Sequence, residues 1–226
     1  MNKVLLWDFD GTLVYQIEPF VLAAQHTLTQ CDVSVSTDEI REYLNGILSW
    51  KKPDIVYTDR CGDFWWDTLF EKLAPFYYSF GISAELYETI KAKYRNKIAD
   101  WRNYTLYEDT ISVLESCTSM GYRNYIMSNN YPELQSIVEA LGLGQYFSGY
   151  FVSACIGYEK PRKELFEYAL VQAGNPECCY MIGDNPISDI EGGRNAGLKT
   201  IFVHREIPSN ANHFCKKLSE IPALLE

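Results

Sequence analysis

Short and continuously apolar segments recur along this chain, and each one ends in polar or glycine residues. The first, residues 4–7, is followed by Asp8-Phe9-Asp10-Gly11. An uninterrupted apolar run of this length predicts a strand buried on both faces, and the glycine predicts where it stops. We expect it to be a central parallel strand. Four further strands are predicted, at residues 122–127, 150–153, 179–182 and 200–203.

Helical patterns lie between these predicted strands. Apolar residues recur at helical spacing within residues 110–120, 132–141 and 161–173. Gly142 marks the end of the second helix, and Pro161 suits the first position of the third. Strands that alternate with helices in this way predict an α/β fold, a parallel sheet with helices on both faces.

Residues 15–104 have a different pattern, because nothing there indicates a buried strand. Four successive amphipathic helices are predicted instead, and their apolar faces predict a small helical bundle. Thr37 is expected to cap the second helix and Ser83 the fourth. The sequence thus predicts a core formed by residues 1–14 and 105–226, with a helical cap domain, residues 15–104, inserted after the first strand.

Length and charge narrow the class of protein. A chain of 226 residues with 47% hydrophobic and 22% charged residues is typical of a globular protein with one large or two unequal domains. Its 20 Lys and Arg residues against 30 Asp and Glu residues give a net charge of -10. Nucleic acids bind mainly through Lys and Arg, so we predict no nucleic-acid partner.

Three further features concern location and metals. No apolar run reaches the ~20 residues of a membrane-spanning helix or the ~7 to 15 of a secretory signal. The seven cysteines are odd in number and contain no C-x-x-C pair, which predicts reduced thiols. The three His residues lack the spacing of a zinc site. We therefore predict a cytoplasmic protein with no membrane partner, and make no prediction of its oligomeric state.

The strongest chemical signal is the pair Asp8 and Asp10 at the carboxyl end of the first predicted strand. Ligands bind at this edge of an open parallel sheet. Side chains repeat every two residues along a strand, so both carboxylates point to one side and repel each other unless a cation or a proton relieves them. Such hard oxygen ligands suit Mg²⁺. The alternative is a turn that uses Asp and Gly only to end the strand.

A second acidic site follows the strand predicted at residues 179–182. Asp184 is expected to reach the same metal, and Asp189 to accept hydrogen bonds that orient the metal's waters. By itself, Asp189 would also suit the N-terminus of a helix. Gly192 and Gly193 each weaken a helix, so we predict that this helix packs very close to a strand.

Two polar positions complete the candidate site. Ser128 and Asn129 follow the strand predicted at residues 122–127, where both can donate to a phosphate oxygen, although Ser-Asn is also an ordinary turn pair. Lys160 precedes Pro161 at a predicted helix start, where its charge opposes the helix dipole. A charge placed against this local preference suggests that it neutralises an anion shared with the carboxylates. The alternative is a surface lysine with its stem along apolar residues.

Together these four strand ends resemble the haloacid dehalogenase-like (HAD) superfamily over nearly the whole chain. Asp8-x-Asp10-Gly11-Thr12 resembles the first motif, Ser128 the second, Lys160 the third, and Gly183-Asp184 with Asp189 the fourth, in the family's order. The resemblance implies a Rossmann-like core with a central first strand. It also implies that the inserted helices form the cap of the first cap class, subfamily I.

The same resemblance implies a role for each residue. Asp8 would be the nucleophile that forms an aspartyl-phosphate, and Asp10 the general acid and then the general base. Ser128 and Lys160 would hold the phosphoryl oxygens, with Gly11, Thr12 and Asn129 also contacting the substrate. Mg²⁺ would be bound by Asp8, the Asp10 carbonyl and Asp184.

The function predicted is that of a magnesium-dependent phosphatase acting on a small phosphate monoester. Asp10 favours this activity, because dehalogenases proper lack an acid there and phosphonate-cleaving members have a small residue. A sugar-phosphate mutase is the alternative, although residues 46–51 do not match the Gly-x-Ser-Arg loop of mutase caps. A non-catalytic binding protein is a second alternative, which the presence of Asp8, Asp10, Lys160 and Asp184 disfavours.

The predicted cap does not identify the substrate, which is expected to be a small phosphorylated metabolite. Aromatic residues at helical spacing, such as Trp65, Phe70 and Tyr77, predict bundle core more than a substrate pocket. Residues 45–52, a turn that contains Gly46 and ends with Trp50, Lys51 and Lys52, are the best candidates to approach the site. At the entrance we expect Tyr15, Gln16 and Glu18. A closing cap would exclude water while the aspartyl-phosphate forms.

Overall fold

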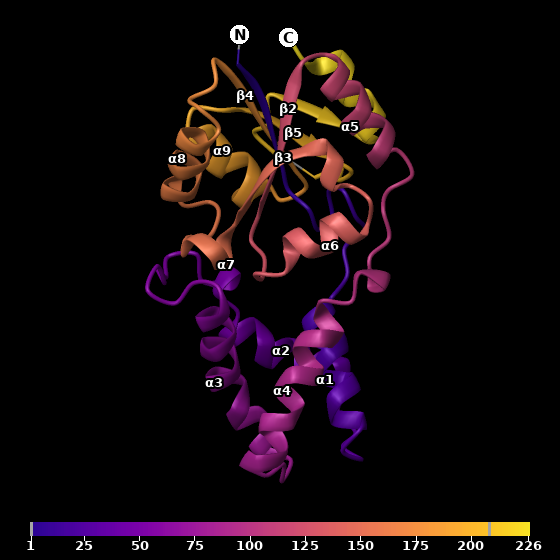
Figure 1. Cartoon of the computed structure of the whole chain (residues 1–226), viewed down its shortest axis with the longest axis vertical. Helices are drawn as coiled ribbons and strands as arrows, with labels where there is room; N and C mark the ends of the chain where they lie inside the picture. Colours follow the sequence, from indigo (N-terminus) through magenta and orange to yellow (C-terminus); the bar gives the residue numbers. More distant parts are fainter. Residues whose placement is uncertain (1, 208) are drawn as a thin grey trace.

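In the part of the chain that the structure describes, residues 2–207 and 209–226, six parallel strands form one sheet. This computed structural model orders them β3-β2-β1-β4-β5-β6, so β1 lies centrally (Figure 1). The strands are β1 (Lys3–Trp7), β2 (Tyr122–Ser128), β3 (Phe147–Val152), β4 (Cys178–Gly183), β5 (Lys199–Val203) and β6 (His213–Cys215). The predicted α/β fold and its central first strand are confirmed.

Two strands differ from the prediction. β3 begins at Phe147, three residues before the predicted start. β6 was not predicted at all. Its three residues lie at the edge of the sheet, and Phe214 is 43% exposed while Cys215 is buried. Such a strand lacks the continuous apolar run that marks a strand buried on both faces.

Helices cover both faces of the sheet. Figure 1 shows α8 (Lys163–Gln172) and α9 (Gly192–Asn195) on one side, and α5 (Thr110–Ser119) and α6 (Leu134–Ala140) on the other. Side chains alternate along a strand, so Leu6 of β1 packs in the apolar cluster of α8, while Leu5 packs in the cluster that includes α5. The sheet therefore has an apolar core on each face.

Gly192 and Gly193 lie where α9 meets its neighbours. A Cβ on Gly193 would lie 2.9 Å from Cγ2 of Thr200 in β5. A Cβ on Gly192 would lie 2.8 Å from the ring of Phe166 in α8. The predicted close packing against a strand is confirmed for Gly193, and Gly192 lies close to a helix as well.

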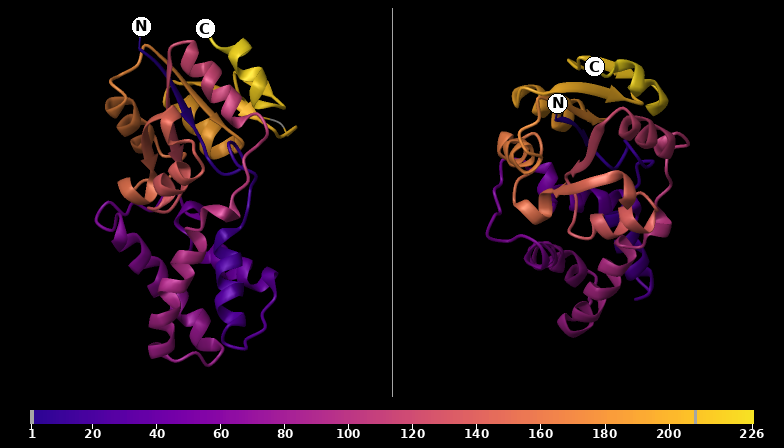
Figure 2. Two further views of the ribbon diagram at one scale, coloured as in Figure 1. Left: turned by 45° about the vertical axis from the view of Figure 1, so that its right-hand side comes forward. Right: turned by 45° about the horizontal axis from the view of Figure 1, so that its top comes forward.

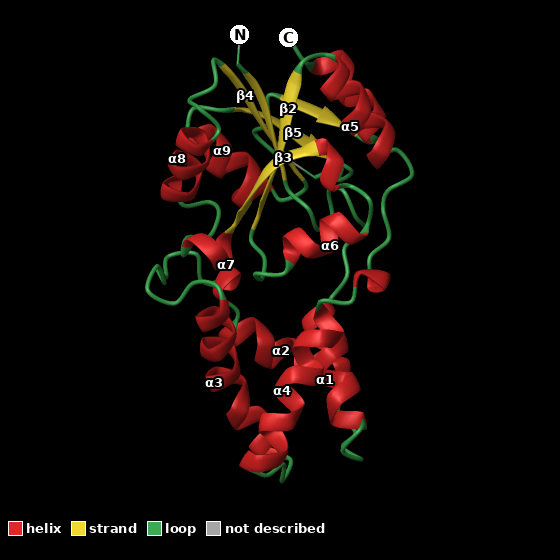
Figure 3. Cartoon of the chain, in the orientation of Figure 1, coloured by secondary structure: helices red, strands yellow, loops and turns green. Residues whose placement is uncertain are grey.

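Four helices form a second lobe between β1 and α5 (Figure 3). They are α1 (Pro19–Thr29), α2 (Thr37–Ile47), α3 (Asp63–Ser79) and α4 (Ala84–Ile98). Ser83 caps α4, as predicted, by accepting from the N–H of Leu86 at 3.2 Å. The prediction that Thr37 caps α2 is wrong, because Thr37 is already helical and Ser36 Oγ accepts from the Glu39 N–H instead.

Aromatic side chains fill the interior of this lobe, which we call the cap. Trp65, Phe70 and Tyr77 are all buried, which confirms their predicted place in the core. Their polar atoms find partners, as buried polar atoms must: Tyr77 OH lies 2.7 Å from Thr27 Oγ1, and Tyr94 OH donates to the Phe20 carbonyl at 3.0 Å. These buried aromatic residues belong to the same continuous hydrophobic cluster as Leu5 and Trp7 of β1.

A segment between α2 and α3 attaches the cap to the rest of the molecule. Tyr57 N–H donates to the Gly157 carbonyl at 3.1 Å, and Gly62 N–H donates to the Ala154 carbonyl at 2.9 Å. Gly157 has φ +94°, and a Cβ there would lie 2.5 Å from Thr58 Cα. Only glycine allows this close approach. The attachment lies beside the chain that leads into Lys160.

Figure 2 shows that the chain begins and ends on the side of the core that lies away from the cap. Within the described residues, no helix combines the length and apolarity needed to cross a membrane. All seven cysteines are free. Burial raises the pKa of the Cys117, Cys179 and Cys215 thiols to about 12, so these thiols stay protonated at neutral pH.

Candidate active site

Asp8 and Asp10 lie where β1 ends. The N–H of Asp8 donates to the Ile182 carbonyl at 2.9 Å, which extends the pairing of β1 with β4. The chain then turns at Gly11, whose φ is +79°. A Cβ on Gly11 would lie 2.5 Å from Asp184 Oδ2, so glycine lets the Asp184 carboxylate lie directly against this turn.

Lys160 lies at the centre of the site and is 2% exposed. Its Nζ donates to Asp8 Oδ1 at 2.7 Å, to Asp189 Oδ1 at 2.6 Å and to the Met127 carbonyl at 2.8 Å. Burial lowers the pKa of the amine, but the two carboxylates raise it more, so the pKa lies above its usual value. The ammonium therefore stays charged and binds both acids.

The setting of Lys160 differs from the prediction. Helix α8 begins at Lys163, because the chain first makes a turn in which Arg162 N–H donates to the Glu159 carbonyl at 2.9 Å. The prediction that Pro161 is the first helical residue is therefore wrong, and Lys160 lies two residues before the N-cap residue Arg162. Asn129 Oδ1 accepts from the Lys160 N–H at 2.7 Å, and Asn129 Nδ2 donates to the Lys160 carbonyl at 2.9 Å. The Asn129 amide thus positions Lys160, and its predicted contact with the substrate stays a prediction.

Asp10 occupies the other side of the β1 end. Its Oδ2 accepts from Asn130 Nδ2 at 2.7 Å, whereas its Oδ1 is buried and has no hydrogen-bond partner among the described residues. Burial and the nearby Asp8 carboxylate raise the pKa of Asp10 to about 7, against the opposing effect of Asn130. This carboxyl group can therefore both give and take a proton near neutral pH.

Three carboxylates gather next to Lys160. One oxygen from each of Asp8, Asp184 and Asp189 lies within 4.8 Å of the others, and all three residues are buried. Burial, with the Asp8 charge as a further cause, raises the pKa of Asp184 to about 6. Three buried carboxylates this close together, with the pKa of Asp184 raised in this way, indicate a place where a cation would relieve repulsion. The oxygen donors fit a hard divalent ion.

Asp189 lies within this group of acids, on a π-helical turn, Pro186–Glu191. Both of its oxygens already accept hydrogen bonds, Oδ1 from Lys160 and Oδ2 from the Asn185 N–H at 3.0 Å. A Cβ on Gly183 would lie 2.1 Å from Asp189 Oδ2, so Gly183 makes room for this carboxylate. Asp189 therefore fixes Lys160, and its predicted role in orienting the waters of a metal stays a prediction.

Sequence analysis missed two residues of the site, Asn130 and Arg205. Asn130 donates a hydrogen bond to Asp10. Its position just after Ser128, at the end of β2, could have indicated it as a site residue. Arg205 follows β5, and its Nη2 lies 2.6 Å from Asp184 Oδ2 and donates to Gln16 Oε1 at 2.6 Å. The rule that ligands bind at the carboxyl ends of parallel strands would have indicated Arg205.

A cleft of about 480 Å³ opens over these residues, between the core and the cap. The core contributes Asp8, Asp10, Ser128, Asn129, Lys160, Asp184, Asp189 and Arg205, and the cap contributes Gln16, Ile17, Phe20, Trp50 and Lys51 among others. The expected approach of Trp50 and Lys51 to the site is confirmed. We call this space the catalytic cleft.

Four predicted residues do not line the catalytic cleft among the described residues. Gly11 and Thr12 donate their N–H groups to the backbone carbonyls of Val14 and Phe9, so they shape the turn, and their substrate contacts stay a prediction. Tyr15 packs on Tyr107 with ring centroids 4.1 Å apart, and Glu18 pairs with Arg41. Because of these contacts, Tyr15 and Glu18 do not line the entrance of the catalytic cleft, where they were expected.

The structure places a buried acidic cluster at the carboxyl edge of a Rossmann-like sheet, beneath a helical cap. A family model for haloacid dehalogenase-like hydrolases matches residues 2–197. The chain belongs to this family of hydrolases.

Individual relatives differ in how much of the chain they match. The glyceraldehyde 3-phosphate phosphatase of Methanothermobacter thermautotrophicus is 28% identical over 215 residues, which cover 92% of this chain and 88% of that protein. The pyrimidine 5'-nucleotidase YjjG of Escherichia coli is 45% identical over 89 residues, 37% of this chain. The matched segment spans 40% of the nucleotidase, less than half of its length.

The fold is shared with solved structures. A crystal structure of the HAD-hydrolase YfnB from Bacillus subtilis, bound to magnesium, aligns with a TM-score of 0.72. The alignment covers 99% of this chain and 98% of that one at 21% identity. At this level of identity the likeness shows the fold alone.

Proposed function

We propose that this hydrolase is a magnesium-dependent phosphatase that cleaves a small phosphate monoester through an aspartyl-phosphate on Asp8. The observation that carries the proposal is the contact between the buried Lys160 ammonium and Asp8 Oδ1, 2.7 Å apart on the floor of the catalytic cleft. This contact orients a carboxylate nucleophile and places a fixed positive charge where a phosphoryl group would arrive. Two of the relatives, a phosphatase and a nucleotidase, carry names that denote phosphate-ester hydrolysis.

Magnesium is proposed to bind to Asp8, Asp184 and the carbonyl of Asp10. Carboxylate oxygens in a compact group are the ligands that Mg²⁺ prefers, and the raised pKa of Asp184 supports a cation there. When bound, the ion would supply positive charge to the phosphoryl oxygens. Arg205, which pairs with Asp184, is close enough to compete for the same carboxylate.

The first half of the reaction uses both acids of the β1 end. An Asp8 carboxylate oxygen attacks phosphorus, and the bond from phosphorus to the leaving oxygen breaks. That oxygen takes the electron pair of the bond and the proton of Asp10. Lys160 and Ser128 are proposed to stabilise the phosphoryl oxygens, a task that dominates catalysis of phosphoryl transfer.

The second half regenerates Asp8. The Asp10 carboxylate takes a proton from a water molecule, and the water oxygen forms a bond to phosphorus. The bond between phosphorus and Asp8 then breaks and inorganic phosphate leaves. A pKa of about 7 suits Asp10 for both halves, because an acid and base with a pKa near the working pH is the most effective.

The mutase alternative gains no support from the residues that the structure describes. Ser49 lies in the segment compared with the mutase loop, and its Oγ donates to Glu159 Oε1 at 2.7 Å. It does not line the catalytic cleft. Hydrolysis therefore remains the proposed outcome.

The substrate is proposed to be a small phosphorylated metabolite in the cytoplasm. A cleft of about 480 Å³ has room for a phosphate group and a small leaving group. Its cap side presents Phe20 and Trp50 beside the polar Gln16 and Lys51, which suits a leaving group with both apolar and polar parts. The net charge of -10 continues to disfavour a nucleic-acid substrate.

Phosphate release from a panel of small phosphate monoesters, with Mg²⁺ or with chelator, tests the proposal. We expect turnover that depends on Mg²⁺ and differs among the esters. The same turnover in chelator would refute the metal requirement, and phosphate transfer between two positions of one sugar, without release, would favour a mutase.

A further inference from the structure

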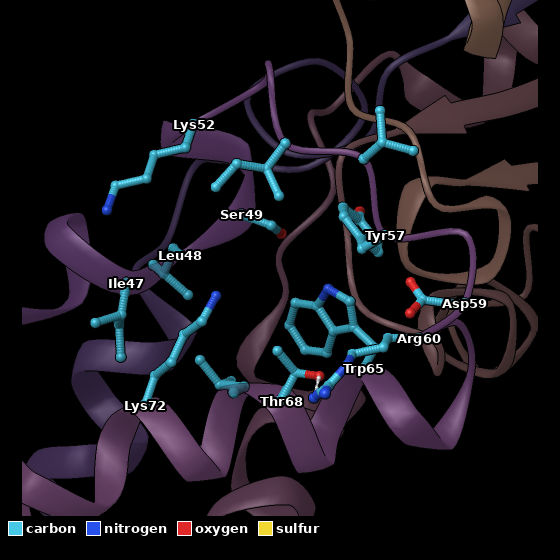
Figure 4. Close-up of a pocket in the computed structure, with 13 residues that line it drawn as sticks. Ile47, Leu48, Ser49, Lys52, Tyr57, Asp59, Arg60, Trp65, Thr68 and Lys72 are labelled. Carbon is cyan, nitrogen blue, oxygen red and sulfur yellow. Dashed lines mark hydrogen bonds between the residues drawn. The ribbon is translucent and has the colours of Figure 1, made fainter.

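A second pocket of about 210 Å³ lies within the cap, and we call it the cap pocket (Figure 4). It is bounded by the end of α2, by α3 and by the segment of residues 52–60 between them. None of its lining residues also lines the catalytic cleft. The cap pocket is therefore a separate site, which the proposed reaction does not use.

The walls of the cap pocket are largely apolar. Leu48 and Leu69 are buried at its base. Ile55 and Val56 also line it, and they are 44% and 45% exposed. Two adjacent aliphatic side chains left exposed at one pocket indicate that the pocket receives an apolar group.

The charge of the cap pocket is opposite to that of the chain. Lys52, Arg60 and Lys72 line it against a single acid, Asp59, although acids outnumber Lys and Arg in the whole sequence by 30 to 20. The Lys72 ammonium has no hydrogen-bond or ion-pair partner among the described residues. In Figure 4, Lys72 rises from α3 toward Leu48. The pocket thus offers a cation to an anionic group.

Trp65 adds a directed donor to the cap pocket. Its side chain is 5% exposed and stands among the lining residues, facing Ser49 and Tyr57 from α3 (Figure 4). The indole N–H finds no acceptor in the part of the chain that the structure describes, whereas those of Trp7 and Trp66 donate to Asn124 and Glu133. Trp65 Nε1 is not among the buried polar atoms that lack a partner, so this donor is open to the pocket and available to a ligand oxygen.

We propose that the cap pocket binds a small organic anion with an apolar body, and that this ligand regulates the enzyme. The apolar part would lie on Ile55, Val56 and Leu69, and the carboxylate or phosphate would lie near Lys72 and Trp65. Binding itself is independent of the proposed phosphatase activity, whereas the effect on catalysis rests on it.

The cap pocket and the catalytic cleft are connected by one short segment, whose residues line one site or the other. Ser49 and Lys52 line the cap pocket, while Trp50, Lys51 and Pro53 line the catalytic cleft. Trp50 also stacks on Trp65, with an interplanar angle of 11° and ring centroids 6.1 Å apart. A ligand that moves this short segment on one side therefore moves the cleft wall on the other.

A second route passes through Glu159. Ser49 and Tyr57, both lining the cap pocket, donate hydrogen bonds to Glu159 Oε1. Glu159 is fully buried and directly precedes Lys160. A ligand that displaces either hydroxyl removes a partner from a buried carboxylate beside the residue that holds Asp8.

Calorimetric titration of the full chain with octanoate, and with 1-octanol as its uncharged match, tests the site. We expect octanoate to bind at least about tenfold more tightly, a difference of about 1.4 kcal/mol. Lys72→Met should abolish that preference, whereas Lys163→Met on α8 should leave it unchanged. Lys72 and Lys163 are both exposed, so both variants should fold, which their melting temperatures verify.

The regulatory claim is tested with a saturating phosphate ester. Octanoate should change kcat of the wild type and have no effect on kcat of Lys72→Met. Equal affinity for octanoate and octanol, or unchanged octanoate binding in Lys72→Met, would refute the site. Octanoate that only competes with the ester would refute regulation. Octanoate binding in a protein that releases no phosphate would refute the proposed function and leave the site in place.

Discussion

Lys160 Nζ donates a 2.7 Å hydrogen bond to Asp8 Oδ1, with the lysine side chain 2% and the aspartate side chain 11% exposed. Lys160 also holds Asp189, so one buried cation serves two carboxylates. Removing one member of a buried charge group leaves the others uncompensated. The pair therefore contributes to folding as well as to the orientation of the nucleophile.

Replacing this lysine should weaken the fold. We expect Lys160→Met to lower the free energy of unfolding by about 3 kcal/mol, since Asp8 and Asp189 lose their cation. Urea denaturation measures the change. Lys163→Met, at a side chain that is 69% exposed, is the matched control and should stay within about 0.5 kcal/mol of the wild type. Equal stabilities of the two variants would contradict the structural role of Lys160.

The acids of the site make the metal-free protein less stable as the pH rises. The pKa of Asp184 is about 6 in the folded chain, against a reference value of 3.8 for the unfolded chain. Between pH 3.8 and pH 6 the folded state therefore binds more protons than the unfolded state. The contribution of Asp184 to the free energy of unfolding is therefore complete below pH 3.8 and decreases as the pH rises to 6. With chelator, Asp184→Asn should be more stable than the wild type by on the order of 2 kcal/mol at pH 7.5, and similar at pH 4.

Magnesium provides the complementary measurement. At pH 7.5, added Mg²⁺ should raise the melting temperature of the wild type and leave that of Asp184→Asn unchanged, because a ligand that binds only the folded state stabilises it. A wild type that is indifferent to Mg²⁺ would argue against the proposed ligands.

Two glycines allow a matched test of the turn after β1. Gly11 and Gly121 have φ of +79° and +84°, but a Cβ would meet Asp184 only at Gly11 and has no atom within 4 Å at Gly121. Alanine at either position should cost about 1 kcal/mol of stability from backbone strain. Only Gly11→Ala should also lose Mg²⁺ affinity and phosphate release. Normal Mg²⁺ affinity in Gly11→Ala would show that the close approach to Asp184 is not needed.

Tyr57 links the cap to Glu159 beside the active site. Tyr57→Phe should lower the free energy of unfolding by about 1 to 3 kcal/mol, because a buried carboxylate loses one of its donors. It should also lower kcat more than it changes KM. Tyr78→Phe, at a tyrosine that is 45% exposed, is the control and should leave stability and both constants near wild type. Similar stability, kcat and KM in the two variants would show that the hydrogen bond from Tyr57 to Glu159 does not influence the active site.

The sequence was most informative where one physical requirement determines the residues. A strand buried on both faces needs a continuous apolar run, so β1 and the acids at its end were predictable from residues 4–11 alone. A choice between adjacent residues was harder to predict. Ser36 and Thr37 are both suitable N-cap residues, and only the backbone conformation at the start of α2 decides between them. The edge strand β6 left no apolar run to find.

Contacts between residues that are far apart along the chain could not be predicted from the sequence. Asn130 and Asp10 are 120 positions apart, and Arg205 and Gln16 are 189 apart, so their contacts depend on how the loops fold over the sheet edge. The contact of Asn129 with the backbone of Lys160, 31 positions later, was not predictable for the same reason. Residue type indicated a polar site, and only the fold assigns each polar atom its partner.

The central claim is that Asp8 is the nucleophile, and the most direct test is the initial rate of phosphate release in Mg²⁺ for the wild type, Asp8→Asn and Asp54→Asn. Asp54 is an exposed acid of the cap and does not line the catalytic cleft, which makes it the control. We predict release by the wild type and Asp54→Asn, and none above background by folded Asp8→Asn. Sustained release by Asp8→Asn would contradict the aspartyl-phosphate mechanism.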